Sequence, residues 1–291
     1  MSQYQQLLLI ASRDLPHSAA TQRAKALATE TGASLHVLGL VEPAGQSYIH
    51  QATAEHLKQY SRELTEAVGA LRQNDVQVTS DAILMQDPIK DLLDYISELK
   101  PDLVIKDTHC ESTFRRVFVT PFDCQLMRAS PVPVHLVNQA RRALPKLIVA
   151  AVDTSSSDQK LLDFNHDIIR AAATMALQCD AQLHLLHAYE ISPAFIAEPG
   201  GATDWVEELR AVLREPFIEL ADFYGVGTDR RHFVMGAPVA VIADLVDELE
   251  VDVVVMGIIQ PKGVDKLMGD TTERTLNLSP CSVLTVKPET P

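Results

Sequence analysis

The sequence predicts an α/β protein in which two doubly wound, parallel-sheet domains follow one another along the chain. Two observations predict this fold class. Strand patterns alternate with helix patterns through the first half, and the second half repeats the same elements in the same order. This alternation is typical of a parallel sheet with helices on both faces and right-handed crossovers. The chain has 291 residues, of which 46 % are apolar, so it can form two cores.

The spacing of apolar residues predicts the first elements. Leu7–Ile10 is an apolar run of strand length. Ser18–Thr31 carries alanines and Leu27 at helical spacing, and Gly32 ends that helix. Ala33–Leu40 alternates in the manner of a strand. The order strand, helix, strand is the beginning of a parallel unit.

The rest of the first half continues this order. A helix is predicted from about Thr53 to Arg72, because its apolar residues fall on one face. Val76–Ile83 is a strand, and Pro88 begins a helix that ends near Leu99, since proline is well tolerated in a first turn. Three elements complete the half: a strand at Asp102–Lys106, a short helix at Pro121–Arg128 and a strand at Val132–Val137.

The second half is a duplicate of the first. ASLHVLGLVE, from residue 33, returns as AQLHLLHAYE from residue 181, and ELKPDLVI, from residue 98, returns as ELEVDVVV from residue 248. Pro88 returns as Pro238, and ASPVPVHLV, from residue 129, returns as LSPCSVLTV from residue 278. These matches share an offset of 148 to 150 residues, which indicates an internal duplication. The predicted domains are residues 1–140 and 145–291, joined by a short polar linker.

A duplicated domain predicts a pseudo-twofold pair, which is a covalent version of a homodimer. The last strand of each half, Val132–Val137 and Cys281–Val286, is apolar and alternating. Each would form an unpaired sheet edge, which favours aggregation unless it is covered. We therefore expect the two strands to lie at the interface between the halves. The sequence leaves open whether two chains also form a homodimer.

Composition excludes several classes of partner. The net charge of −14 disfavours binding to nucleic acid or to an anionic membrane. No apolar run is long enough for a membrane span, and the N-terminus has no secretory signal pattern. The four cysteines are scattered without a CxxC pair, which fits a reducing cytoplasm. We therefore expect a cytoplasmic protein.

A glycine-containing stretch follows the fourth strand pattern of the second half. The apolar run at Val253–Val255 ends at Gly257, and Gly263 and Gly269 follow at equal intervals. Asp270 and Thr271 come next, where a helix should begin. A strand, a glycine loop and a helix N-terminus together can hold a phosphate, because the first amides of a helix are unpaired and the helix dipole favours an anion.

These features resemble the universal stress protein family. The carriers of the resemblance are an Asp after a first strand (Asp153), DVVVMG with the glycine loop, and SPCSVLTVKP near the end. The resemblance covers nearly the whole chain, twice, and is strongest to tandem members of the E type. It implies a flavodoxin-like, Rossmann-like sheet of order 3-2-1-4-5 in each half. It also implies a cytoplasmic role in stress survival with little or no catalysis.

The glycine loop departs from the family's ATP-binding pattern, G-x2-G-x9-G-[ST]. Gln260 replaces the second glycine, Pro261 removes an amide donor, and the last glycine comes one residue early. One interpretation is a nucleotide site for ATP or AMP, which would use Asp153, Gly257, Gly263, Gly269, Asp270 and Thr271. The other is a degenerate loop whose glycines only form the turn, and the departures favour it.

The first half departs further, since it has no glycine from Asp107 to Leu126. Arg115 and Arg116 could hold an anion there, although an arginine pair in a loop is more often solvated surface. Asp153 could instead cap the helix that begins in Ser155–Asp158.

Other candidates give weaker signals. His36 and His184 occupy equivalent positions of the repeat, and His187 faces the other side of its strand. No spacing brings a further metal ligand to them, so no metal site is predicted. No catalytic motif is present. The irregular segment Ile191–Val206 suggests either a hydrophobic pocket at the carboxyl edge of the sheet or a loop that packs on its own domain.

Together these patterns predict a non-catalytic stress-response protein that binds a small ligand or a protein partner. One alternative is an ATP- or AMP-binding, weakly hydrolysing protein that uses the second domain. Another is an interaction scaffold without a ligand.

Overall fold

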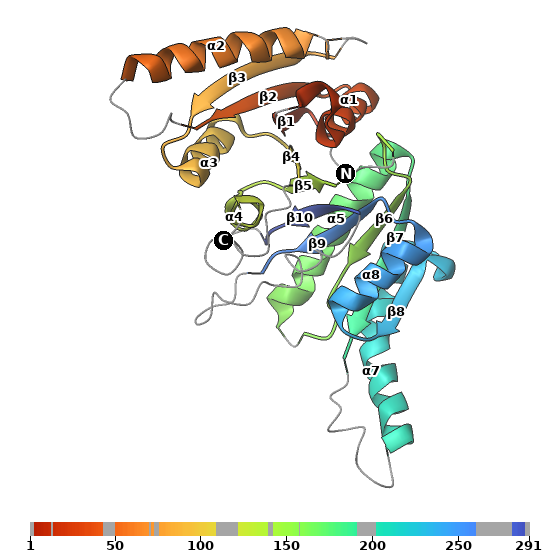
Figure 1. Ribbon diagram of the computed structural model, residues 1–291. Coiled ribbons are helices and arrows are strands. Elements are labelled where there is room, and N and C mark those ends of the chain that lie inside the picture. The colour runs from red at the N-terminus through yellow and green to blue at the C-terminus, as the bar shows by residue number, and fades with distance from the viewer. Residues whose placement is uncertain are drawn as a thin grey trace. The chain divides into compact units, whose positions relative to one another are not determined.

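The computed structural model of the 291-residue chain describes residues 3–12, 14–42, 50–69, 71–72, 76–108, 122–138, 142–156, 158–190, 202–259 and 281–288, with the backbone alone at 50–53 and 202–206 (Figure 1). The chain divides into two compact units. The first unit contains Met1–Leu144 and Ser282–Lys287, and the second contains Pro145–Cys281 and Pro288–Pro291. The first unit therefore takes the last strand of the sequence, which the predicted boundary assigned to the second domain.

The first unit is built on a sheet in the order β3-β2-β1-β4-β5-β10. Its strands are β1 (Gln6–Ile10), β2 (Ser34–Val41), β3 (Val78–Leu84), β4 (Leu103–Asp107), β5 (Val134–Val137) and β10 (Ser282–Val286). The first five are parallel in the order 3-2-1-4-5, which confirms the predicted fold class. β10 pairs antiparallel with β5, with Val283 opposite Leu136. The two strands that were expected to meet therefore pair with each other.

Helices cover both faces of this sheet. They are α1 (Ala19–Thr31), α2 (His50–Gly69), α3 (Pro88–Leu99) and α4 (Phe122–Ala129), with a 3-10 turn, η1, at Leu15–His17. Figure 1 shows α1 and α2 on one face of the sheet and α3 and α4 on the other. The core strands are almost inaccessible to solvent; Leu7, Leu8 and Leu9 of β1 are each 0 % exposed. This full burial explains why these strands form continuous apolar runs.

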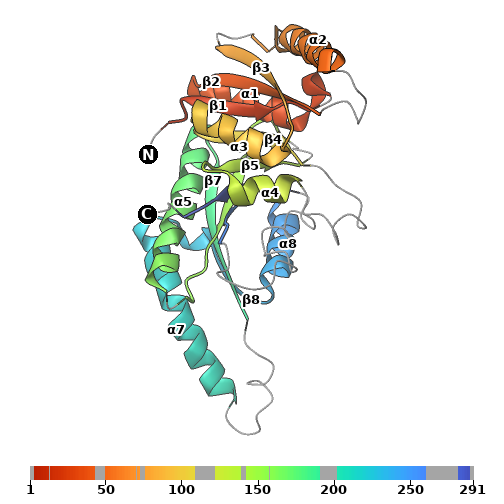
Figure 2. The same ribbon diagram turned by 90° about the vertical axis from the view of Figure 1, so that its left-hand side faces the viewer.

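The second unit repeats this arrangement with strands in the order β8-β7-β6-β9. Its strands are β6 (Leu147–Ala151), β7 (Gln182–Tyr189), β8 (Arg231–Met235) and β9 (Val253–Gly257), and its helices are α5 (Gln159–Cys179), α7 (Ala202–Phe223), α8 (Pro238–Leu249) and the 3-10 turn η3 (Thr228–Arg230). All three strand pairs are parallel. Figure 2 shows α5 and α7 on one side of the strands and α8 on the other.

One predicted irregular segment is partly helical. α7 begins at Ala202, so the last five residues of Ile191–Val206 belong to a helix and not to a loop. Residues 191–201 lie outside the described residues. Two glycines and two prolines between Ile191 and Gly201 gave the segment its irregular pattern, and they precede the helix.

Equivalent aspartates accept the same backbone hydrogen bonds in both units. The Asp102 side chain accepts hydrogen bonds from the amides of Gln5 (2.6 Å) and Gln6 (2.9 Å). Its repeat equivalent, Asp252, accepts from the amides of Lys146 (2.7 Å) and Leu147 (3.1 Å). Each carboxylate precedes a central strand and satisfies the amides at the start of its neighbour. This shared arrangement is structural evidence for the duplication.

A buried arginine holds the segment that follows β5. The Arg23 side chain is 1 % exposed, and it donates to the carbonyls of Ala143 (2.5 Å) and Arg142 (3.1 Å). Its Nη1 also lies 3.1 Å from Nε2 of His135, whose Nδ1 lies 3.3 Å from the Val283 carbonyl. Burial, helped by the Arg23 charge, lowers the pKa of His135 to about 3. His135 is therefore neutral, with Nε2 accepting from Arg23 and Nδ1–H donating to β10.

Candidate functional site

The second unit brings Asp153 and Gly257 to one edge of its sheet. β6 and β9 are neighbours, with Ala151 opposite Met256, so both candidate residues lie at the carboxyl ends of adjacent strands. This edge, beside the first strand of the repeat, is where ligands bind in open α/β sheets. The other predicted site residues, Gly263, Gly269, Asp270 and Thr271, lie outside the described residues, as do Arg115 and Arg116.

Asp153 forms a local turn. One carboxylate oxygen accepts from the amide (2.9 Å) and the hydroxyl (2.6 Å) of Ser155. The backbone of Asp153 is held by Asn165, which accepts from its amide at 3.0 Å and donates to its carbonyl at 2.8 Å. The predicted capping role is wrong, because Asp158 is the N-cap of α5 and accepts from the Lys160 amide at 3.0 Å. The Asp153 side chain remains exposed at the strand end.

Gly257 is required by packing. A Cβ atom at this position would lie 2.3 Å from Cε1 of Phe164 and 2.9 Å from Cδ1 of Ile168. Both side chains belong to α5, and both are buried. The absence of a side chain at Gly257 therefore lets α5 approach β9 closely. This steric role explains the glycine without any ligand.

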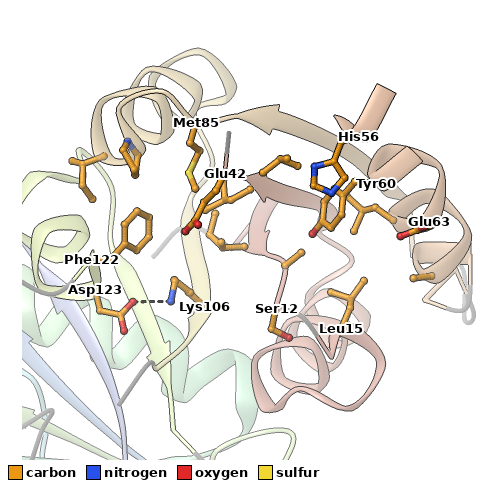
Figure 3. A pocket seen from close by; sticks show the side chains of 18 of the residues that line it. Ser12, Leu15, Glu42, His56, Tyr60, Glu63, Met85, Lys106, Phe122 and Asp123 are labelled. Carbon is orange, nitrogen blue, oxygen red and sulfur yellow. Dashed lines mark ion pairs between the residues drawn. The ribbon is translucent and has the colours of Figure 1, made fainter. Parts of the chain in front are cut away.

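The first unit contains a cavity at the carboxyl edge of its sheet. It has a volume of about 1210 Å³, larger than the roughly 300–1,000 Å³ of most ligand pockets. It lies at the carboxyl ends of β1, β2, β3 and β4, where Ser12, Glu42 and Met85 follow the first three strands and Lys106 belongs to the fourth. Figure 3 shows these side chains converging from the sheet, with His56, Tyr60 and Glu63 of α2 on the opposite side.

The walls of the cavity are mainly apolar. They include side chains of the strand ends and of the covering helices: Ile10, Leu15, Leu40, Leu64, Met85, Ile89 and Phe122. Gly39 allows the ring of Tyr60 to reach β2, since a Cβ atom there would lie 2.3 Å from its Cε1. Burial, with the nearby Glu63 charge, raises the pKa of the Tyr60 hydroxyl, so that hydroxyl stays protonated. An apolar chamber with a few polar groups is typical of a small-molecule site.

A buried ion pair forms part of the floor. Nζ of Lys106 lies 2.7 Å from Oδ1 of Asp123, and the two side chains are only 6 % and 4 % exposed. Lys106 also donates to the Asp107 carbonyl at 2.9 Å, and its Nζ lies 5.7 Å from the ring centroid of Phe122. Asp123 stands in the first turn of α4, where the helix dipole favours a negative charge. The sequence signal for this pair was a lysine at the end of an otherwise apolar strand.

Asp107 has a different role from its equivalent, Gly257. Its Oδ1 accepts from the Ala20 amide at 2.9 Å, in the first turn of α1. Its Oδ2 is buried and has no hydrogen-bond partner among the described residues. The carboxylate thus satisfies a helix amide at the point where a phosphate-binding loop would begin.

The histidines of the second unit form separate polar contacts. His184 and His232 stack with ring centroids 5.2 Å apart, and Nδ1 of His184 lies 2.9 Å from Nε2 of His232. Burial lowers the pKa of both imidazoles. His187 faces the other side, as predicted, and stacks on Phe233 at 5.3 Å. Within the described ranges, no three His, Cys, Asp or Glu side chains come together to hold a metal ion.

The model of the universal stress protein family matches residues 4–138 and, a second time, residues 145–287. The chain belongs to the universal stress protein family. The two matches cover both sheets described above, and family membership supports a role in the stress response.

Curated relatives confirm the predicted resemblance to the E type. A universal stress protein E homolog from Haemophilus influenzae is 29 % identical over 192 residues, which cover 64 % of this chain and 62 % of the relative. Universal stress protein E from Escherichia coli K12 is 26 % identical over 196 residues, covering 65 % and 61 % respectively. The match therefore spans less than two thirds of the length of these relatives.

Solved structures confirm the fold over nearly the whole chain. A structure from Pseudomonas aeruginosa PAO1, described as a functionally unknown protein, is 24 % identical with a TM-score of 0.73 and covers 98 % of this chain and 93 % of its own. A universal stress protein from Archaeoglobus fulgidus is 15 % identical with a TM-score of 0.67, covering 97 % and 96 %. At these identities the similarity shows the fold alone.

The universal stress protein motif and the cavity lie in different repeats. The residues that match the family's glycine pattern belong to the second unit, whereas the described cavity belongs to the first. A search of the described helices finds none that is long and apolar enough to cross a membrane.

Proposed function

We propose that this universal stress protein acts in the cytoplasm by binding a small, largely apolar ligand in the cavity of its first unit, without catalysing a reaction. The observation that carries the proposal is the cavity itself, which combines apolar walls with convergent polar groups at the carboxyl edge of a parallel sheet. Its position matches the switch point between β1 and β4, where neighbouring connections leave the sheet in opposite directions.

The polar groups of the cavity favour binding over catalysis. Ser12 contributes a hydroxyl to the lining, and its Oγ makes no hydrogen bond within the described part of the chain. A serine nucleophile needs a neighbouring base to activate it. The lining offers two candidate bases. Lys106 is held in an ion pair with Asp123, and His56 makes no hydrogen bond to Ser12, whose Oγ has no partner within the described residues. These groups can position a ligand, but they do not form a nucleophile–base set.

A neutral apolar probe tests the cavity. We expect N-phenyl-1-naphthylamine to gain fluorescence with the full chain, and Ala67→Trp, which fills the cavity from α2, to weaken that binding at least tenfold. Glu66→Trp is the matched control, since Glu66 is exposed on the same helix and does not line the cavity. Equal loss in both variants, or no fluorescence gain with the wild type, would overturn the proposal. Mass spectrometry of the purified chain should also detect a co-purified apolar molecule.

A nucleotide site in the second unit is the second candidate. The observation that favours it is that Asp153 and Gly257 share the carboxyl edge of β6 and β9, with the Asp153 side chain exposed. Titration calorimetry with ATP and AMP tests it, with Asp153→Asn as the variant and Asp163→Asn, an exposed carboxylate on α5, as the control. Heat that Asp153→Asn alone abolishes would support the site, and phosphate release above that variant's level would support weak hydrolysis. No heat with either nucleotide would exclude it.

A further inference from the structure

The charges around the first-unit cavity are unbalanced. The described lining contains four carboxylates, Glu42, Glu63, Asp87 and Asp123, against one lysine, Lys106, and one histidine, His56. Asp87 is the N-cap of α3 and accepts from the Lys90 amide at 3.3 Å, so part of its charge is compensated by that helix. The remaining groups leave the lining negative.

Lys106 is not available to an anionic ligand. Its ammonium group is already 2.7 Å from the Asp123 carboxylate, and both side chains are buried. A ligand phosphate could reach Lys106 only by displacing Asp123, which would leave a buried carboxylate without its cation. Separating a buried ion pair in this way is strongly unfavourable. Asp123 thus occupies the position that a ligand's anionic group would need, beside the lysine and in the first turn of α4.

Glu42, in contrast to Lys106, is available to a ligand. It follows the end of β2 and is exposed, and Figure 3 shows its carboxylate pointing into the cavity, toward the side that carries Phe122 and Lys106. No hydrogen bond or ion pair engages its side chain within the described ranges. Glu63 approaches from α2 on the other side, where it accepts from Gln59 at 2.9 Å. The rings of Tyr60 and Phe122 also line the chamber, and aromatic faces attract cations.

We propose that the first-unit cavity selects ligands that join an apolar body to a positively charged alkylammonium group and excludes phosphorylated or sulfated ones. The inference rests on the proposed function of the cavity as a ligand site. The apolar walls receive the body of the ligand, and Glu42 receives its cation. The Lys106–Asp123 pair serves as an internally neutralised floor that offers no anion site.

Two probes with the same tail and opposite charge test this selectivity. Titration calorimetry of the full chain would use decyltrimethylammonium and decyl sulfate, both below their micelle concentrations. We expect the ammonium probe to bind at least tenfold more tightly. Glu42→Gln should weaken it about fivefold, which is the upper range for one partly exposed ion pair, and added salt should reduce that difference. Ala67→Trp should remove the binding of the ammonium probe.

A control variant tests whether the effect of Glu42 depends on its place in the cavity or on the negative net charge of the whole chain. Glu190 is the repeat equivalent of Glu42, is also exposed, and does not line the cavity, so Glu190→Gln should leave the affinity unchanged. Glu42→Lys should reverse the preference toward decyl sulfate. Equal binding of both probes, or equal effects of Glu42→Gln and Glu190→Gln, would overturn the charge selectivity while the binding site stands. If neither probe nor N-phenyl-1-naphthylamine binds, the proposed function itself fails.

Discussion

At the carboxyl ends of β4 and β9, the first repeat carries Lys106 and Asp107 where the second carries Met256 and Gly257. In the first repeat, the lysine pairs with Asp123 and the aspartate accepts from an amide of α1. In the second, Met256 is apolar and Gly257 lets α5 pack against the strand. The same two positions therefore build a polar floor in one unit and a closely packed helix contact in the other.

The second strands of the two repeats, β2 and β7, differ in the size of the side chain at one equivalent position. Gly39 of β2 corresponds to His187 of β7. Gly39 admits Tyr60, which borders the cavity, whereas His187 stacks with Phe233, and Phe233 stacks with Tyr189 at 4.5 Å. In the first unit, the small Gly39 and the charged Lys106–Asp123 pair accompany the cavity. In the second unit, the rings of His187, Phe233 and Tyr189 occupy the corresponding face of the sheet. The cavity described above therefore lies in the repeat that has no glycine pattern.

The largest expected effect concerns the buried ion pair. Asp123→Ala should destabilise the first unit by about 3–5 kcal/mol, because it leaves the Lys106 charge buried. The double variant Lys106→Met/Asp123→Leu, which copies Met256, should recover most of that loss. Urea unfolding measures both.

An exposed pair provides the control for this prediction. Lys90 and Asp94 lie 2.6 Å apart with side chains 68 % and 62 % exposed, so Lys90→Met should cost less than about 1 kcal/mol. If Asp123→Ala costs no more than Lys90→Met, the floor of the cavity is not held by charge.

The two packing glycines give the next largest effect. Gly257→Ala should cost about 2 kcal/mol, since the added methyl group meets Phe164 and Ile168, both buried in α5. Gly39→Ala should cost about 1 kcal/mol, because the ring it meets, Tyr60, borders the cavity and can turn into it. Urea unfolding followed by circular dichroism measures both costs, because it follows both units, whereas tryptophan fluorescence comes from Trp205 in the second repeat, the only tryptophan of the sequence. Equal costs at the two glycines would contradict the view that Tyr60 has free space beside Gly39 and that the side chains beside Gly257 do not.

The histidine pair predicts a pH dependence in the second unit. Burial lowers the pKa of His184, and the charges of His232 and Arg230 lower it further while Asp229 opposes them. Burial also lowers the pKa of His232, against Glu248. The unfolded chain then binds protons more readily than the folded one just below pH 6.5. Stability should be complete above about pH 6.5 and fall as the pH drops, by at most about 1.4 kcal/mol per pH unit for each histidine.

A double variant isolates this contribution. His184→Gln/His232→Gln should flatten the decline in urea midpoint, followed by Trp205 fluorescence, between pH 6.5 and 5. His36→Gln changes the repeat equivalent of His184 in the first unit and should leave the Trp205 transition unaffected. An unchanged slope in the double variant would show that other groups, such as His187, govern the acid response.

The sequence predicted the fold well because its signals are local. Alternating elements, Pro88 and Pro238 at helix starts, and Gly32 at a helix end each act within a few residues. The Asp102 and Asp252 contacts and the Arg23 network join residues about 100 positions apart, and no spacing rule reveals such pairs.

The candidate site was harder to predict for the same reason. The glycine pattern drew attention to Gly257, but its physical role depends on Phe164, which lies 93 positions earlier on another element. The first-unit cavity arises from side chains at the ends of four strands, on three α-helices and on the 3-10 turn η1, and these do not form a motif along the chain. The lysine in the DLVIKD strand was the one local clue, because a buried charge requires a partner.

The smallest expected effect is at Asp153. Its carboxylate is exposed and, among the described residues, accepts from Ser155 alone, two residues away. Asp153→Ala should therefore cost about 0.5 kcal/mol, and Asp153→Asn, which keeps an acceptor, close to nothing. Urea unfolding of both variants checks this order. Because the asparagine variant preserves the fold, any loss of ATP-binding heat that it causes belongs to the lost carboxylate and not to a damaged second unit. A destabilisation above 2 kcal/mol would instead show that Asp153 is a structural residue, and the nucleotide hypothesis would then lose the exposed side chain that supports it among the described residues.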